Sequence, residues 1–295
     1  DATLACLRLA KAVNAVSERH FQSCKDRWSN LPETAPWSAI TNGVTSSFWQ
    51  PDEWQRVMSP RVIEELKAEY KLRMRYYILG RTDKDLDNKR LTIGWFRRFT
   101  EYKRPKLLFR YFDWLVDHLE KGYFQLLIGG KPHPDEDVMV AAWNDIYRMA
   151  RDLPNLVILH GYDPLMSRIV KAGCDLWYAS PRVPYEACST SGMSAAMLGA
   201  NLLSTRDGWF WELDPAERNV FLFGTSMPSA VYEQDAYDAL ELRRVIDEEV
   251  IPEYYDRKSE WYKRAARIKK IAEERYNSTR MMRQYWEFYG LGDKA

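Results

Sequence analysis

A short segment, residues 181–212, holds most of the side chains that suit ligand binding. It contains five consecutive small residues ahead of a stretch with helical character: Cys188, Ser189, Thr190, Ser191 and Gly192. Small residues let a ligand approach backbone N–H groups, and the N-terminus of a helix carries partial positive charge. The segment therefore predicts an anion-binding site, where we expect a phosphate group and a sugar to meet.

A basic turn is the second chemical feature. Arg97 and Arg98 precede Tyr102, and Lys103 and Arg104 follow it, directly after a predicted strand. Arginine offers a planar fork and lysine a point charge, so two such cations at a strand end can clamp a phosphate. The alternative is a solvated basic loop, but a nearby loop rich in Ser and Thr favours the phosphate site.

Three weaker candidates accompany these segments. Gly129, Gly130 and Lys131 end another predicted strand, but a Gly-Gly pair is commonly a turn and the P-loop motif is missing. Glu186 would be repelled by phosphate, so it is expected to accept hydrogen bonds from sugar hydroxyls, or to be a charge at a helix start. Asn42 begins an Asn-Gly pair, which predicts either a tight turn or an amide offered to a ligand hydroxyl.

Composition excludes several classes of protein. The 295 residues carry 43 basic and 42 acidic side chains, a net charge of +1 that favours neither nucleic acid nor an anionic membrane. The spacing of four Cys and four His residues suggests neither a disulfide framework nor a metal site, so we expect a reducing compartment, the cytoplasm. No membrane-spanning run, signal peptide or serine hydrolase motif is recognised.

The elements that must position these residues alternate from residue 91 onward. Apolar strands near residues 91–96, 124–130, 155–162, 174–180 and 201–205 are separated by predicted helices. This alternation predicts a doubly wound parallel sheet, an α/β fold that binds ligands beyond the carboxyl ends of its strands.

The flanking segments are predicted to be helical. An amphipathic pattern covers residues 1–27, and helices are expected over residues 49–80, 235–257 and 259–289, with Pro252 interrupting the helix over 235–257. The solvated face of the helix over 49–80 is predicted to carry Glu53, Arg56, Glu64, Glu65 and Lys67. The charged stretch 81–90 is read as a linker and a domain boundary.

Several segments together resemble one family. The runs ITNGVTSSFW, IGWFRRFTEYKRPKLLF, IGGKPHP, HGYDPLMSRIVKAGCDLWYASPRVPYEACSTSGMSAAMLGA and DGWFWE are similar, in order, to motifs of the α-glucan (glycogen and maltodextrin) phosphorylases. The resemblance covers the end of that family's N-terminal half and its C-terminal half. It implies a GT-B fold with Rossmann-like domains: residues 1–87 end the N-terminal domain, 88–235 form the C-terminal donor domain, and 236–295 are helices that pack back.

The resemblance also implies roles for single residues. Arg98 and Lys103 would bind the substrate phosphate beside Tyr102, and Arg97 falls where the family touches the phosphate of its cofactor. With Glu186, which would bind sugar hydroxyls, Arg98 and Lys103 form the implied catalytic set.

Further implied contacts lie on two loops. Asn42 would bond a hydroxyl of the donor glucose. Ser189, a glycine in the family, and Thr190 would present loop amides and a hydroxyl to phosphates, and Ser191 and Gly192 continue that loop.

Ser194 marks the main departure from the family. The motif EASGTSxMK ends in the lysine that forms a Schiff base with pyridoxal phosphate, whereas this chain reads EACSTSGMS. Serine cannot form an imine, and Lys171 is expected to be separated from Ser194 by a strand and a helix. The sequence therefore argues against pyridoxal phosphate, and neither a covalent cofactor nor a metal is expected.

Three functions remain open from the sequence. Phosphate-binding residues without the lysine favour a retaining glycosyltransferase that moves a glucosyl unit from a nucleotide-sugar to a glucan or another acceptor. Many such enzymes have a second Glu where this chain has Ser194. The alternatives are an α-glucan phosphorylase that makes glucose 1-phosphate, with pyridoxal phosphate bound non-covalently if at all, and a non-catalytic glucan-binding or regulatory subunit. The rest of the N-terminal half, with the family's THT-type loop, is expected as a partner segment, and homo-oligomers are left open.

Overall fold

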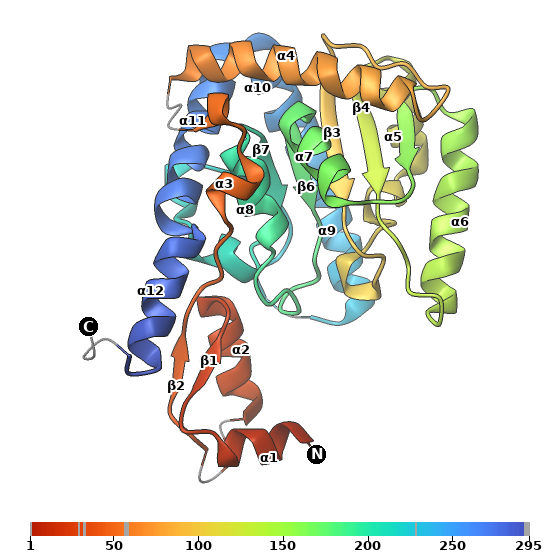
Figure 1. Ribbon diagram of the computed structural model, residues 1–295. Helices are drawn as coiled ribbons and strands as arrows, with labels where there is room; N and C mark the ends of the chain where they lie inside the picture. Colours follow the sequence, from red (N-terminus) through yellow and green to blue (C-terminus); the bar gives the residue numbers. More distant parts are fainter. Residues whose placement is uncertain (1, 29, 32–33, 56–58, 228, 292–295) are drawn as a thin grey trace.

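A six-stranded parallel sheet forms the centre of the larger part of the molecule (Figure 1). The protein is described by a computed structural model that covers residues 2–28, 30–31, 34–55, 59–227 and 229–291. The strands lie in the order β5-β4-β3-β6-β7-β8. Their bounds are β3 (Leu91–Phe96), β4 (Phe124–Gly129), β5 (Leu156–Leu159), β6 (Leu176–Ala179), β7 (Asn201–Ser204) and β8 (Phe221–Leu222). The predicted α/β fold is confirmed, and β8 is a strand that the pattern did not reveal.

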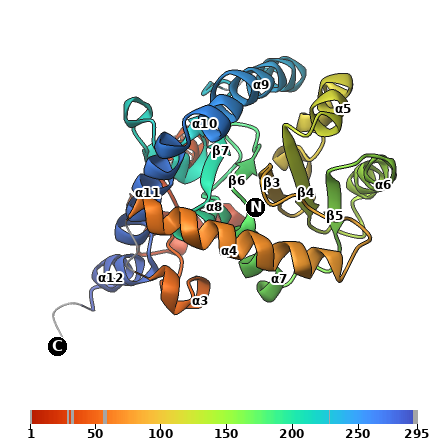
Figure 2. The same ribbon diagram turned by 90° about the horizontal axis from the view of Figure 1, so that it is seen from above.

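Helices cover both faces of the sheet (Figure 2). One face packs against α5 (Phe112–Glu120), α6 (Asp137–Asp152) and α9 (Val231–Val245), and the other against α7 (Pro164–Gly173), α8 (Thr190–Met197) and α11 (Lys258–Arg275). Alternate strand residues serve the two cores: Ile93 and Leu126 belong to the first, Phe96 and Leu127 to the second. Burial on both faces explains why the strands are mostly apolar.

The strand order places a ligand site between β3 and β6. Strand β3 pairs with β4 on one side and with β6 on the other, so successive crossovers run in opposite directions from this point. In doubly wound sheets a crevice opens there, beyond the carboxyl ends of the strands. Helix α4 (Pro60–Leu79) crosses the opposite end of the sheet and leaves the carboxyl ends uncovered (Figure 1).

A smaller N-terminal lobe lies below the carboxyl ends of the strands (Figure 1). It contains α1 (Ala2–Leu9), β1 (Val13–Ala15), α2 (Glu18–Trp28) and β2 (Trp37–Ala39), with β1 and β2 paired in parallel. The single helical pattern expected over residues 1–27 is therefore wrong. Val13 to Ala15 pair with residues far along the chain, and this pairing overrides the local periodicity.

The C-terminal helices pack back on the N-terminal part, as predicted. Helix α12 (Ser278–Phe288) lies against the Asn-Gly turn, where Val44 N–H donates to Tyr276 O and Ser278 N–H to Val44 O, both at 2.9 Å. A side chain at Gly43 would place its Cβ 2.3 Å from Asn277 O. Only glycine permits this close approach, which fixes the turn.

The remaining elements are short. They are α3 (Ser46–Trp49), α10 (Ile251–Asp256), a π-helical turn (Ile246–Val250) and 3-10 turns at Asp52–Trp54, Glu101–Lys103, Leu107–Phe109, Gly208–Glu212 and Pro215–Glu217. The predicted linker follows α4 and precedes β3; the domain limits remain predictions. Within the described ranges, no helix is both long and apolar enough to cross a membrane.

The solvated face predicted for α4 is wrong at Lys67. This side chain is buried, and its Nζ donates to Ala172 O at 2.8 Å and to Leu198 O at 3.3 Å. Burial is possible because these carbonyl groups replace water as acceptors. Arg56 lies outside the described residues.

Candidate functional site

The basic turn after β3 meets the loop after β6 at the predicted crevice. Arg97 is buried and donates to Glu186 Oε2 at 3.1 Å and to Ser189 Oγ. Lys103, also buried, donates to the same Oε2 atom at 2.9 Å, and its ammonium lies over the ring of Tyr102. Two cations of the turn thus converge on one carboxylate oxygen.

The charges of Arg97, Lys103 and Glu186 act on one another at this junction. Burial alone would raise the pKa of Glu186, but the charges of Arg97 and Lys103 more than offset it, so the pKa is lowered. Burial, with help from the charge of Arg97, lowers the pKa of Lys103 to about 8 despite the opposing effect of Glu186. Oε1 of Glu186 accepts no hydrogen bond from the described residues and can receive one from a ligand hydroxyl.

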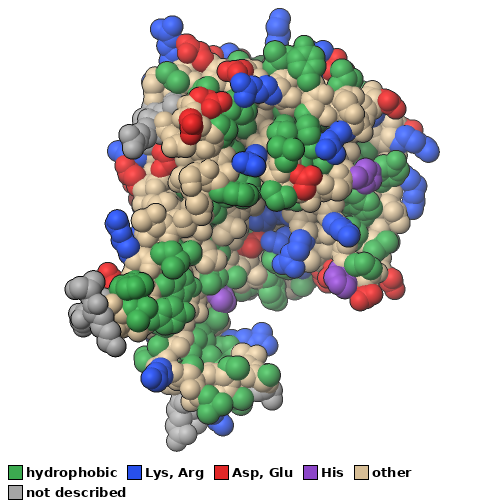
Figure 3. Space-filling model, in the orientation of Figure 1, with side chains coloured by type: hydrophobic (Ala, Val, Ile, Leu, Met, Phe, Trp, Pro, Cys, Tyr) green, Lys and Arg blue, Asp and Glu red, His purple; other side chains and the backbone are tan. Residues whose placement is uncertain are grey.

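Arg98 differs from its neighbour Arg97. Its side chain is exposed and forms no hydrogen bond or ion pair with the described residues. It lines a cavity of about 350 Å³ in which Glu186 is the only carboxylate among the lining residues. Three cations against one carboxylate leave this cavity positively charged, and Figure 3 shows basic side chains gathered where the molecule is hollowed above the N-terminal lobe.

Most of the predicted site residues line this one cavity. They are Asn42, Arg97, Arg98, Tyr102, Lys103, Glu186, Ser189, Thr190 and Ser191. We call it the phosphate pocket.

The loop after β6 is shaped by its own backbone. Ser189 adopts a left-handed conformation, with φ at 76° and ψ at 57°, and directly precedes α8. Asp207, which is fully buried, accepts hydrogen bonds from Glu186 N–H at 2.8 Å and from Gly208 N–H at 3.0 Å. Burial raises the pKa of Asp207 to about 7. Asp207 therefore positions Glu186, a role that the sequence analysis did not predict.

Asn42 reaches the phosphate pocket from the N-terminal side. Its N–H donates to Val16 O at 3.0 Å, and Arg280 of α12 donates to its carbonyl oxygen at 3.2 Å. The backbone is thus held from both sides at a residue that lines the cavity.

Four of the predicted residues do not line the phosphate pocket. The structure places Gly129 where a Cβ would lie 2.2 Å from the Phe96 ring and Gly130 where it would lie 2.0 Å from Arg97 O. These glycines, with Lys131 after them, let the end of β4 lie close to the end of β3. Gly192 faces Phe210, at 3.2 Å from a built Cβ, and serves packing.

A second cavity, of about 310 Å³, lies against the same helix. It shares Thr190 and Ser191 with the phosphate pocket and is also lined by Ser194 and Lys171. We call it the lysine cavity. The prediction that no lysine lies near Ser194 is therefore wrong, because α7 and α8 contact each other and bring the two side chains to one cavity.

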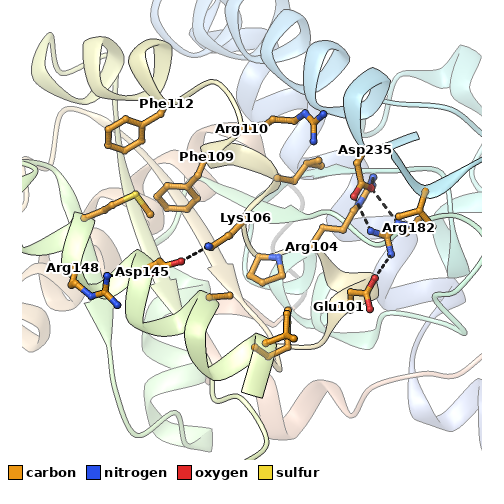
Figure 4. A pocket seen from close by; sticks show the side chains of 17 residues that line it. Glu101, Arg104, Lys106, Phe109, Arg110, Phe112, Asp145, Arg148, Arg182 and Asp235 are labelled. Carbon is orange, nitrogen blue, oxygen red and sulfur yellow. Dashed lines mark hydrogen bonds and ion pairs between the residues drawn. The ribbon is translucent and has the colours of Figure 1, made fainter. Parts of the chain in front are cut away.

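A larger hollow than either of these two cavities lies beside the basic turn (Figure 4). Its volume is about 900 Å³, and its floor includes Phe109 and Met139. Most of its cations are neutralised: Lys106 pairs with Asp145, and Arg182 with Asp235 at 2.8 Å. Paired charges make this hollow a poorer anion site than the phosphate pocket.

Sequence comparisons relate the chain to known proteins. It is 33% identical, over 97% of its length, to an uncharacterized protein of Methanocaldococcus jannaschii. It is 30% identical over 96% of its length to the glycogen phosphorylase of Mycobacterium tuberculosis, and 28% identical over 96% to the maltodextrin phosphorylase of Thermococcus litoralis.

The chain is homologous to the glycogen and maltodextrin phosphorylases. It spans 54% of the archaeal protein and 39–48% of the glycogen phosphorylases. No protein-family model matches it. The resemblance seen in the motifs is supported, and the α/β sheet is consistent with the phosphorylase-like GT-B fold.

The phosphorylase relationship implies pyridoxal phosphate, and the lysine cavity fits such a group. Trp49 and Tyr162 offer aromatic walls, Thr190 and Ser191 offer hydroxyls at a helix N-terminus, and Lys171 offers an amine. A flat ring, a phosphate and an aldehyde would each find suitable chemistry there. Among the described residues, no cluster of three or more His, Cys, Asp or Glu side chains could hold a metal ion.

Proposed function

We propose that the protein carrying this chain is a hexosyltransferase of the phosphorylase type, which uses phosphate to cleave a glucan and release glucose 1-phosphate. The supporting observation is the phosphate pocket, where Arg97, Arg98 and Lys103 face the single carboxylate of Glu186. A dianionic phosphate would neutralise the excess charge. The homologues that carry the phosphorylase name support the same reading.

The roles of the residues follow from their contacts. Arg98 has donors to spare, so it binds phosphate without losing a partner, and Lys103 adds a second charge beside it. Phosphate then shares Lys103 with Glu186, whose oxygens turn to hydroxyls of the sugar. Asn42 offers its amide to another hydroxyl. The cations also stabilise the charge that moves between the phosphate and the glycosidic oxygen. Pyridoxal phosphate in the lysine cavity would be held by residues such as Lys171, Thr190 and Ser191, and it would supply a second phosphate group.

A nucleotide-sugar transferase is the second candidate. It is favoured by Ser194, which occupies the position of the family's lysine, and by the aromatic walls of the lysine cavity, which suit a nucleobase as well as a pyridine ring. In that case the diphosphate of the donor would extend from Thr190 to Arg98, and glucose 1-phosphate would not be a product.

The catalytic cleft is proposed to need a further segment. The chain covers about half or less of its relatives, and strands β1 and β2 pair only with each other among the described residues. A two-stranded parallel sheet is too small to be stable alone. We place the remaining N-terminal half, from the same protein or from a separate subunit, along this sheet.

The test compares donors on the intact protein. Phosphate release from glucose 1-phosphate with a glucan acceptor is expected, and Arg98→Ala is expected to weaken phosphate binding by roughly 10- to 100-fold, because a hydrogen bond to a charged group contributes about 1.5–3 kcal/mol. Turnover of UDP-, ADP- or GDP-glucose instead would select the second candidate. Glucan binding without turnover of any donor would identify a non-catalytic subunit.

A further inference from the structure

Lys171 is unusual among the buried lysines of this protein. The described chain has five lysines that are 0–7% exposed: Lys67, Lys71, Lys103, Lys171 and Lys269. Four of them donate to oxygen atoms: Lys67 to backbone carbonyls, Lys71 to Asp175, Lys103 to Glu186 and Lys269 to Glu273. Lys171 forms no hydrogen bond or ion pair with the described residues.

The surroundings of Lys171 are aromatic. Its Nζ lies 3.6 Å from the ring centroid of Trp49 and 5.6 Å from that of Trp177, and the side chain is only 2% exposed. Aromatic faces attract an ammonium but accept no proper hydrogen bond. Burial lowers the pKa of Lys171 to about 7, so the neutral amine, with its free electron pair, is accessible near neutral pH. A lysine in this state is a nucleophile towards carbonyl carbon.

The lysine cavity around this amine is built for a particular kind of molecule. Trp49 and Tyr162 line it, and the Tyr162 ring stacks on Phe96 at 5.6 Å, which fixes its orientation. Thr190 and Ser191 begin α8, whose N-terminus favours an anion. Ser194 leaves room that a longer side chain would fill. A flat ring that carries a phosphate and an aldehyde satisfies all of these features.

We propose that Lys171 is the carbonyl-reactive amine of the lysine cavity and holds an aromatic aldehyde phosphate, of the pyridoxal phosphate class, as an imine. The Nζ lone pair attacks the aldehyde carbon, the C=O bond is replaced by C=N, and the carbonyl oxygen leaves as water with the two amine hydrogens. No oxidant or reductant is needed. The attachment point thus lies on α7, whereas the family motif has its lysine on the equivalent of α8.

This inference deepens the proposed function, since an imine-bound pyridoxal phosphate belongs to phosphorylase chemistry and not to nucleotide-sugar transfer. The two can fail separately. Imine formation without phosphate release from glucose 1-phosphate would support the role of Lys171 and contradict the proposed reaction. Turnover of glucose 1-phosphate by a protein in which Lys171 takes up no label would support the reaction and contradict the role of Lys171.

The experiment is chemical labelling of the purified protein. Stoichiometric pyridoxal 5′-phosphate is expected to give the absorbance band of an imine, and reduction with borohydride followed by peptide mass spectrometry is expected to place the phosphopyridoxyl group on Lys171. In Lys171→Met both the band and the label at this position are expected to disappear. Lys103, which also has a lowered pKa but is paired with Glu186, is the internal comparison.

A double variant guards against a folding defect. Lys171→Met combined with Ser194→Lys returns an amine to the same cavity from α8, and it is expected to recover the label on residue 194. Label on Lys103 or on surface lysines alone would overturn the proposal, as would an imine band that survives in Lys171→Met. Failure of both the native protein and the double variant to take up label would show that the cavity does not hold this class of aldehyde.

Discussion

Lys103 is the residue whose protonation decides the charge of the phosphate pocket near neutral pH. It shares Glu186 with Arg97, but only the lysine can lose its proton under mild conditions. Ser189 is the second residue on which the pocket depends, because it holds a left-handed backbone conformation and also bonds Arg97. Both residues can be tested by substitutions that leave the rest of the site in place.

Phosphate binding is expected to weaken as the pH rises through about 8. Burial lowers the pKa of Lys103 to about 8, so the ammonium that attracts phosphate is present below this pH and is lost above it. Calorimetric titration with inorganic phosphate should give a dissociation constant up to roughly fivefold larger at pH 9 than at pH 8. In Lys103→Arg the guanidinium stays charged, so the constant should stay nearly flat. Equal pH dependence in both proteins would contradict the role of Lys103.

Ser189→Gly is expected to be more stable than Ser189→Ala by about 1 kcal/mol. Both variants lose the hydrogen bond to Arg97. The left-handed conformation costs residues other than glycine about 1–2 kcal/mol, so only the glycine variant is relieved of this strain. The larger loss of backbone entropy of glycine on folding offsets part of that gain. Urea unfolding of the two variants measures the difference. A glycine variant no more stable than the alanine variant would mean that Ser189 is not strained.

At the scale of elements, the site depends on how α7 and α8 are fixed to the sheet. Lys67 of α4 donates to Ala172 O at the end of α7 and to Leu198 O just after α8. One buried ammonium therefore ties together the two helices that carry Lys171 and Ser194. The lysine cavity exists because these helices are held side by side.

Lys67→Met is expected to lower the free energy of unfolding by about 2–3 kcal/mol. The substitution keeps much of the apolar stem but leaves buried carbonyl groups without a donor. Chemical denaturation provides the measurement. Lys270→Met, at an exposed position on α11, is the matched control and should change stability by less than about 0.5 kcal/mol. Similar effects of the two substitutions would show that the hydrogen bonds of Lys67 do not stabilise the packing of α7 and α8.

At the scale of the whole molecule, one carboxylate is a shared contact between the N-terminal lobe and the rest of the chain, beside other links such as the hydrogen bond from Ser17 Oγ to Ala187 O at 2.6 Å. Glu212 accepts hydrogen bonds from Glu18 N–H at 3.2 Å, from Thr41 Oγ1 at 2.8 Å and from Tyr276 O–H at 3.1 Å. It thereby connects the lobe, the loop after β7 and the end of α11. Since Asn42 follows Thr41, the position of the lobe sets one wall of the phosphate pocket.

Glu212→Ala is expected to loosen the lobe while leaving the central sheet intact. Hydrogen exchange of the β1 and β2 amides should speed up by about tenfold or more, because at least one hydrogen bond of about 1.5 kcal/mol is lost, whereas β3 and β4 amides should be unchanged. Glu233→Ala, at an exposed position on α9, should alter neither region. Faster exchange in β3 and β4 would show instead that the lobe and sheet unfold together.

The sequence alone determined the features that are local. Alternation of apolar strands and helices gave the parallel α/β sheet, and the residues of the basic turn and the Ser/Thr loop were recognisable because each set is contiguous. Ser194 stood out for the same reason, since a motif fixes what is expected at one position. These signals depend on neighbours in the chain. The basic turn and the Ser/Thr loop each follow a strand, and in parallel α/β sheets the carboxyl ends of the strands form the ligand site.

Tertiary structure alone decided the contacts between segments that lie far apart in the sequence. It paired Glu186 with Arg97 and Lys103, buried Lys67 beneath two helix ends, and brought Lys171 to the cavity that Ser194 lines. A periodic pattern tells which face of a helix is buried but not which neighbouring helix it meets. Burial without an oxygen partner, which lowers the pKa of Lys171, arises only once α3, α7 and α8 have packed together.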